Sequence, residues 1–128
     1  MNSTPFNICF NDGNTVWTNM PLALTELFGL NHRRIKVDLS DVDKIRLSVR
    51  VSTVGSTNAV LFLQYSTDES AWSTLTSNLT LNGVASTRVS PWESIPAGAK
   101  GDVFIRVVGQ GGDGVADPVL GNIYFTYR

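Results

Sequence analysis

Polar and apolar residues alternate strictly along residues 44–52, and the apolar positions there are Ile45, Leu47, Val49 and Val51. This period of two predicts a β-strand with one face against a core and the other face in water. Residues 59–66 are instead apolar on both faces, which is typical of a central strand covered on both sides. Turn-forming residues occupy positions 54–58, so we expect the chain to double back between the two strands.

The same kind of pattern extends over most of the remaining chain. Residues 35–39, 102–108 and 122–127 alternate in the same way, and residues 79–89 have the pattern of a further hairpin with a turn at Asn82-Gly83. We expect eight to nine short strands and no long helix. The prediction is an all-β protein, an antiparallel β-sandwich of jelly-roll-like type over residues 35–128.

Residues 1–34 are the least regular part, and we expect an irregular N-terminal arm or short strands packing on the sandwich. Leu24, Leu27 and Phe28 have the spacing of one helical turn, which Gly29 would end. Two interpretations remain open. The segment is either a loop or helical turn that closes one end of the sandwich, or an arm that packs on a partner surface.

Two further stretches are candidates for contact with a partner. His32, Arg33 and Arg34 form the main basic cluster, either as the solvated start of a strand or as a contact for an acidic protein surface. The loop at residues 109–121 has five glycines and one proline, and irregular loops of that length are often binding elements. The candidate partner-binding residues are therefore Leu24, Leu27, Phe28, His32, Arg33, Arg34, Asp113 and Asp117.

The composition and net charge limit which functions and partners are expected. The chain has 128 residues, enough for one domain with its own core, and only 16% of them are charged. A net charge of −1 gives no general attraction to nucleic acid or to an anionic membrane, so we expect neither as a partner. No apolar run reaches the length of a membrane span. The N-terminal residues lack the pattern of a secretion signal, so either the protein is made and used in a cytoplasm or the sequence begins after processing. Of these two, we expect synthesis in a cytoplasm without secretion.

Histidine and cysteine, which many catalytic and zinc sites use, each occur only once in the sequence. With one His and one Cys, the chain has no ordinary zinc site and no Cys-His pair, and His32 has no nucleophile-elbow sequence to serve. Calcium could bind Asp113 with Asp117, or Asp38 with Asp41 and Asp43, although turn-forming aspartates are commoner. We expect no enzymatic activity, no metal and no cofactor.

Several segments resemble small structural proteins of tailed bacteriophages and prophages. The segments that carry the resemblance are residues 26–29, 32–34, 36–40, 63–68 with Trp72, 102–109, 114–118 and 121–124. The resemblance implies a β-sandwich virion component without catalytic residues, made in the host cytoplasm. Within that class it favours a capsid (head) decoration protein, often trimeric, which binds the major capsid protein on the outside of the shell.

A second interpretation comes from the aromatic residues. A carbohydrate-binding or receptor-binding β-sandwich module of a tail or baseplate would present Trp17, Trp72 or Trp92 on an exposed face. A small hydrolase is a third class, but no pair of carboxylates in the sequence is singled out for it.

Overall fold

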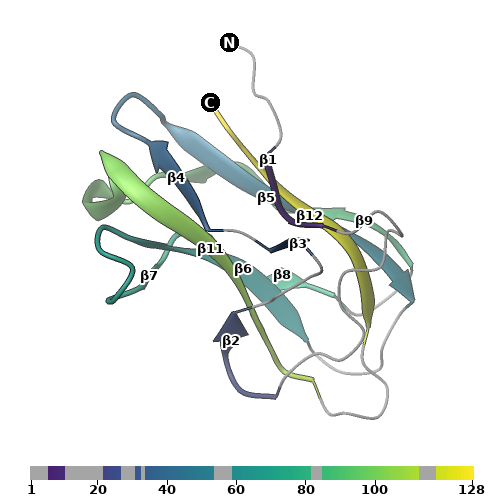
Figure 1. Ribbon diagram of the computed structural model, residues 1–128. Helices are drawn as coiled ribbons and strands as arrows, with labels where there is room; N and C mark the ends of the chain where they lie inside the picture. Colours follow the sequence, from purple (N-terminus) through teal and green to yellow (C-terminus); the bar gives the residue numbers. More distant parts are fainter. Residues whose placement is uncertain are drawn as a thin grey trace.

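The computed structural model describes residues 6–10, 22–26, 31–32, 34–53, 59–81, 85–112 and 118–128. These residues form two antiparallel six-stranded sheets that pack against each other (Figure 1), which confirms the predicted all-β sandwich. No helix in the described part of the chain is long and apolar enough to cross a membrane.

Sheet A is built around two long strands, β5 and β12. Its order is β10 (Glu93–Ser94), β5 (Lys44–Thr53), β12 (Val119–Tyr127), β1 (Phe6–Phe10) and β3 (Asn31–His32), and β9 (Ser86–Val89) also pairs with β5. The register places Tyr124 opposite Ser48 and Phe125 opposite Leu47. The long strands of this sheet therefore come from the middle and from the end of the sequence.

Sheet B is built around β6 (Val60–Ser66) and β11 (Asp102–Gln110). Its order is β2 (Thr25–Glu26), β11, β6 and β7 (Ser73–Thr74), with β4 (Ile35–Asp38) also paired to β11 and β8 (Leu79–Thr80) to β6. A 3-10 turn at Ala97–Ala99 precedes β11. Because β4 and β2 both pair with β11, sheet B brings residues from the N-terminal third beside residues above 100.

One core lies between the sheets, and the alternating positions fill it. Leu61 and Leu63 of sheet B, Ile105 of β11 and Phe125 of sheet A are all fully buried in the same cluster, as the period-two pattern predicts. On β6 the opposite face is closed as well, since Phe62 and Gln64 are each only 7% exposed. The prediction of a central strand covered on both sides is therefore confirmed.

Two local predictions are wrong. The segment at residues 79–89 is not a hairpin, because β8 pairs with β6 in sheet B whereas β9 pairs with β5 in sheet A. Thr25 and Glu26 do not belong to a helical turn, because they form β2 and pair with Gly109 and Val108 of β11. In both cases a pairing with a distant strand determines the structure, and the local pattern carries no trace of that pairing.

The number of strands also differs from the expected eight to nine. The described residues form twelve strands, and several of these, such as β2 and β7, have only two residues. Within residues 1–34, β1, β2 and β3 belong to the two sheets, whereas residues 22–24 and Arg34 are described outside any strand. β1 lies between β12 and β3 in sheet A, and its Ile8 is completely buried in the core.

Candidate binding surfaces

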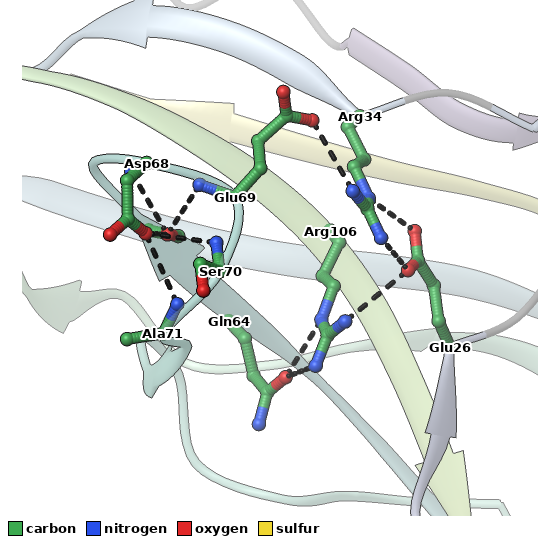
Figure 2. A network of polar contacts seen from close by, with 9 residues as sticks. Glu26, Arg34, Gln64, Asp68, Glu69, Ser70, Ala71 and Arg106 are labelled. Carbon is green, nitrogen blue, oxygen red and sulfur yellow. Dashed lines mark hydrogen bonds and ion pairs between the residues drawn. The ribbon is translucent and has the colours of Figure 1, made fainter.

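A network of polar side chains covers part of the outer face of sheet B. Glu26 lies at its centre with only 6% of its side chain exposed. Arg34 donates from Nε and Nη2 to the two carboxylate oxygens of Glu26 at 3.1 and 2.8 Å, and Arg106 donates from Nη1 at 3.3 Å. Arg106 also donates from Nε and Nη2 to Oε1 of Gln64 at 2.9 and 2.7 Å. Figure 2 shows both guanidinium groups converging on the Glu26 carboxylate.

Strand pairing brings these groups together. Ile105 and Val107 point into the core, so Arg106 between them points away from it, opposite Gln64 in the register of β6 and β11. Glu26 pairs with Val108, one strand further out, and Arg34 directly precedes β4, which pairs with β11 as well. Four residues separated by up to 80 positions in sequence thus meet on one face of one sheet.

The electrostatics of the network agree with its geometry. The hydrogen bonds from Arg34 to Glu26 raise the pKa of Arg34 above its ordinary value. Burial lowers the pKa of Arg106, and the charge of Glu26 partly opposes that effect. A buried carboxylate with two guanidinium partners is compensated and hydrogen-bonded, which is the condition under which a charge is tolerated away from water.

Trp72 and the turn between β6 and β7 border this network. The guanidinium carbons of Arg106 and Arg34 lie 4.2 and 5.0 Å from the centre of the Trp72 ring, at cation–π distance. In the turn, Oδ1 of Asp68 accepts the N–H groups of Ser70 and Ala71 at 2.8 and 3.1 Å (Figure 2). These hydrogen bonds, with that of Ser70 the strongest, lower the pKa of Asp68. The Trp72 ring therefore already contacts two side chains of its own chain.

The outer face of sheet A is shaped differently, because it contains two neighbouring hollows. The larger has a volume of about 380 Å³ and is lined by Ser48, Val49, Arg50, Thr87, Gly121, Asn122 and Tyr124. The smaller, of about 220 Å³, is lined by Arg46, Ser48, Val89, Tyr124 and Thr126. The two share Ser48 and Tyr124 and together form a groove across β9, β5 and β12, which we call the sheet A groove.

An irregularity in β12 shapes the larger hollow. Leu120 pairs with Val51 and Ile123 with Val49, so two residues of β12 stand where β5 has one, which is the definition of a β-bulge. The two bulge residues are Gly121, which adds no side chain to the lining, and Asn122. The amide Nδ2 of Asn122 donates to the hydroxyl of Tyr124 at 3.4 Å.

The groove is lined by positive and neutral side chains. Its described lining includes Arg46 and Arg50 and no carboxylate. The guanidinium carbons of Arg46 and Arg128 lie 4.4 and 4.3 Å from the centre of the Trp92 ring. The Arg50 side chain is exposed and has no hydrogen bond, ion pair or ring contact within the described part of the chain. Its charge is therefore available at the rim of the larger hollow.

A third surface lies before β2, where two leucines face solvent. Leu22 is 79% exposed and Leu24 is 47% exposed. The backbone beneath them is held, because the carbonyl of Leu22 accepts the N–H of Gly111 at 3.1 Å and Thr25 pairs with Gly109. Since Glu26 is anchored at the end of the same segment, the side chains of Leu22 and Leu24 stand on a fixed support.

The candidate residues from the sequence fall in different places. Leu24 lies on the exposed surface before β2, and Arg34 lies in the Glu26 network with a third of its side chain exposed. His32 pairs with Cys9 between β3 and β1 through its backbone. The other five candidates lie outside the described residues, namely Leu27, Phe28, Arg33, Asp113 and Asp117. Trp17 lies outside them as well.

The described residues contain no candidate metal site. No group of three or more His, Cys, Asp or Glu side chains could hold a metal ion in that part of the chain. Asp38 instead accepts the backbone N–H of Ser40 at 2.9 Å and its hydroxyl, and these bonds lower the pKa of Asp38. Its role is that of a turn-forming aspartate.

Sequence reasoning missed the residues that matter most on the two outer faces, namely Glu26, Arg106, Arg50 and Tyr124. The alternation of β5, β11 and β12 does place Arg50, Arg106 and Tyr124 on the outward faces. It does not say which outward residues meet across strands, because that depends on sheet order and register.

Comparisons with known proteins do not assign the chain to a family. No family model matches the chain, no curated protein matches it, and no solved structure matches it.

Proposed function

We propose that this chain is a non-enzymatic structural protein of a phage virion, a capsid decoration protein that binds the outside of the head as an oligomer. The resemblance of its strand segments to small virion proteins of tailed phages supports this, and so does a sandwich that carries exposed apolar side chains on a fixed support. The observation that carries the proposal is the pair Leu22 and Leu24, 79% and 47% exposed beside the rim of sheet B.

Exposed leucines on ordered backbone are suited to docking against another protein. Large apolar side chains at a protein contact supply much of the binding energy when they become buried. The segment is already held by β2 and by the Glu26 network, so little conformational entropy is lost when a partner covers it. A shell of repeated capsid subunits would offer many equal docking places, and an oligomer would bind them with raised effective concentration.

Co-sedimentation with heads assembled without this protein tests the proposal. The intact chain should coat such heads, and the double variant Leu22→Asp, Leu24→Asp should lose coating while it keeps the unfolding midpoint of the intact chain. The control is Val89→Asp, which changes a 49% exposed apolar residue on sheet A and should leave coating intact. An intact chain that never binds heads would overturn the proposal.

Arg34 and the N-terminal strand are poor probes of this contact. Replacing Arg34 would remove the bidentate partner of the buried Glu26 carboxylate. The replacement would therefore loosen β2 itself. Removing β1 would take Ile8 out of the core. A loss of coating in either variant would report on folding as much as on docking.

Self-association is part of the same proposal. A closed trimer would carry three copies of the Leu22 and Leu24 surface on one particle, so each docked copy would raise the effective concentration of the others without open-ended growth. Light scattering should give the mass of a trimer. A monomer mass at tens of micromolar protein would contradict the oligomer. Docking of single copies on heads would then still be decided by the co-sedimentation test.

The sheet A groove favours a second candidate function, a saccharide-binding module of a tail or baseplate. Trp72 and Trp92, two of the three tryptophans expected to carry that role, each pack against two guanidinium groups. Among the described lining residues of the groove, the aromatic one is Tyr124, and it stands among hydroxyl and amide side chains. The candidate sugar-binding surface is therefore the face of β9, β5 and β12.

A further inference from the structure

We infer that the sheet A groove binds a saccharide that bears a carboxylate, with Arg50 pairing with the carboxylate and Tyr124 packing against the sugar ring. The inference rests on the second candidate function and adds the site, the ligand class and the role of each residue. It does not depend on whether the protein coats a capsid. Four properties of the groove support it.

The first property is size and shape. The larger hollow, at about 380 Å³, falls within the range of about 300–1,000 Å³ that is usual for small-ligand sites. The smaller hollow continues it past Ser48 and Tyr124. An elongated site with two compartments fits adjacent rings of a glycan chain better than one compact ligand.

The second property is the mixture of groups on the lining. Ser48, Thr87, Asn122 and Tyr124 carry hydroxyl or amide groups that both donate and accept hydrogen bonds. Sugar hydroxyls also do both, so hydroxyl and amide groups of this kind can pair with them either as donors or as acceptors. The tyrosine ring supplies the flat apolar surface that the C–H face of a sugar ring requires.

The third property is charge. The groove is lined by Arg46 and Arg50 of β5, and its described lining has no carboxylate to neutralise them. The field over the groove therefore attracts an anion. A guanidinium presents a planar fork that matches a carboxylate with two parallel hydrogen bonds. Arg50 is the group free to do so, because Arg46 already lies over Trp92.

The fourth property is preorganisation. The lining residues stand on paired strands, and the bulge at Gly121 and Asn122 is fixed by pairing on both of its sides. A long hydrogen bond of 3.4 Å from the Asn122 amide to the Tyr124 hydroxyl links the two side chains across the lining. In the Glu26 network, by contrast, an anion would have to displace a buried carboxylate from Arg34 and Arg106.

The first experiment is a glycan array with neutral, sulfated, uronic-acid and sialic-acid glycans, probed with the full chain. The expected result is retention on glycans that carry a carboxylate. Equal retention on neutral glycans would show that the carboxylate is not required, which would overturn the inference but leave saccharide binding as the second candidate function. Retention on sulfated glycans alone would also overturn the inference. Retention on none would overturn both the inference and the second candidate function.

The second experiment measures the role of each residue by calorimetric titration. The probes are the best-retained acidic oligosaccharide and its methyl ester, in which the carboxylate is neutral. Arg50→Gln should weaken binding of the acid roughly tenfold to a hundredfold, the usual loss for a charge-assisted hydrogen bond. The same variant should leave binding of the ester unchanged, whereas Tyr124→Ala should weaken both.

Lys36→Gln is the matched control, because it removes one positive charge from an exposed position on sheet B. It should leave both affinities unchanged. If Lys36→Gln weakens the acid as much as Arg50→Gln does, only the net charge matters and the assigned pairing is wrong. If Tyr124→Ala unfolds the chain, Tyr124→Phe is used instead, because it keeps the ring and removes only the hydroxyl. This variant should lower the affinity for the acid and for the ester equally.

Discussion

The outer faces of the two sheets both carry arginines, tyrosine or tryptophan rings and neutral polar side chains, yet they arrange them differently. On sheet B, Arg34 and Arg106 hold the buried carboxylate of Glu26 and pack on Trp72. On sheet A, Arg50 borders a hollow and its side chain makes no hydrogen bond or ion pair within the described residues. The first arrangement closes a surface, and the second leaves one available to a ligand.

The difference shows how the same residue type serves stability or binding. A charged group that is desolvated and paired inside the fold becomes costly to remove, because its partner is then left uncompensated. A charged group at a concave exposed surface contributes little to folding and keeps its hydrogen-bonding capacity. The two faces should therefore respond in opposite ways to mutation, and the following predictions test that contrast.

The largest effect should come from the core that both faces cover. Leu63 is fully buried, so Leu63→Ala should lower the free energy of unfolding by about 2–5 kcal/mol, as a buried leucine does. Urea denaturation measures the change. Thr67→Ala, on the exposed turn after β6, is the control and should stay within about 0.5 kcal/mol. Equal effects of the two variants would contradict the assigned core.

The same substitution on each face should separate the two arrangements. Arg106→Gln should cost about 1–3 kcal/mol, because Glu26 and Gln64 both lose a partner and Glu26 is buried. Arg50→Gln should change stability by no more than about 0.5 kcal/mol. Both are measured by urea denaturation. Similar losses at the two positions would remove the contrast between the faces.

A smaller effect should distinguish the buried part of the network from its rim. Arg34 also donates to Glu69 at 3.3 Å, but 40% of the Glu69 side chain is exposed. Glu69→Gln should therefore change the free energy of unfolding by less than about 1 kcal/mol, as exposed ion pairs do. A loss as large as that of Arg106→Gln would show that Glu69 belongs to the buried centre.

Much of the fold could be predicted from the sequence because its information is local. Alternation along β5 and β11, and the doubly apolar β6, identify strands and core positions such as Leu47 and Leu63 without knowledge of any partner strand. Burial requires this pattern directly. The sandwich class follows once several such strands occur with turn residues between them.

The candidate sites could not be predicted to the same degree, because they depend on register and sheet order. Glu26 meets Arg106 only through the pairing of a two-residue strand, β2, with β11. Arg50 and Tyr124 line one hollow only because β12 pairs with β5 and contains a bulge. Two residues of pairing leave no periodic signal, and a bulge shifts the alternation by one position.

The smallest predicted effect concerns acid and the turn that borders the sheet B network. The hydrogen bonds from Ser70 and Ala71 lower the pKa of Asp68 below its unfolded value of 3.8. A lowered pKa in the folded chain means that the turn is stabilised above the unfolded pKa and that this contribution is lost as pH falls through the folded pKa. Acid should therefore weaken the turn only below about pH 4.

Asp68→Asn isolates this contribution, because the amide oxygen still accepts the two N–H groups but does not titrate. The unfolding midpoint of the variant should fall less than that of the intact chain between about pH 6 and pH 2. Asp102→Asn is the control, since the Asp102 side chain is exposed and has no hydrogen bond within the described residues. Its acid profile should follow that of the intact chain. If Asp68→Asn follows it too, the turn does not depend on the charge of Asp68, and the border of the sheet B network is held by neutral hydrogen bonds alone.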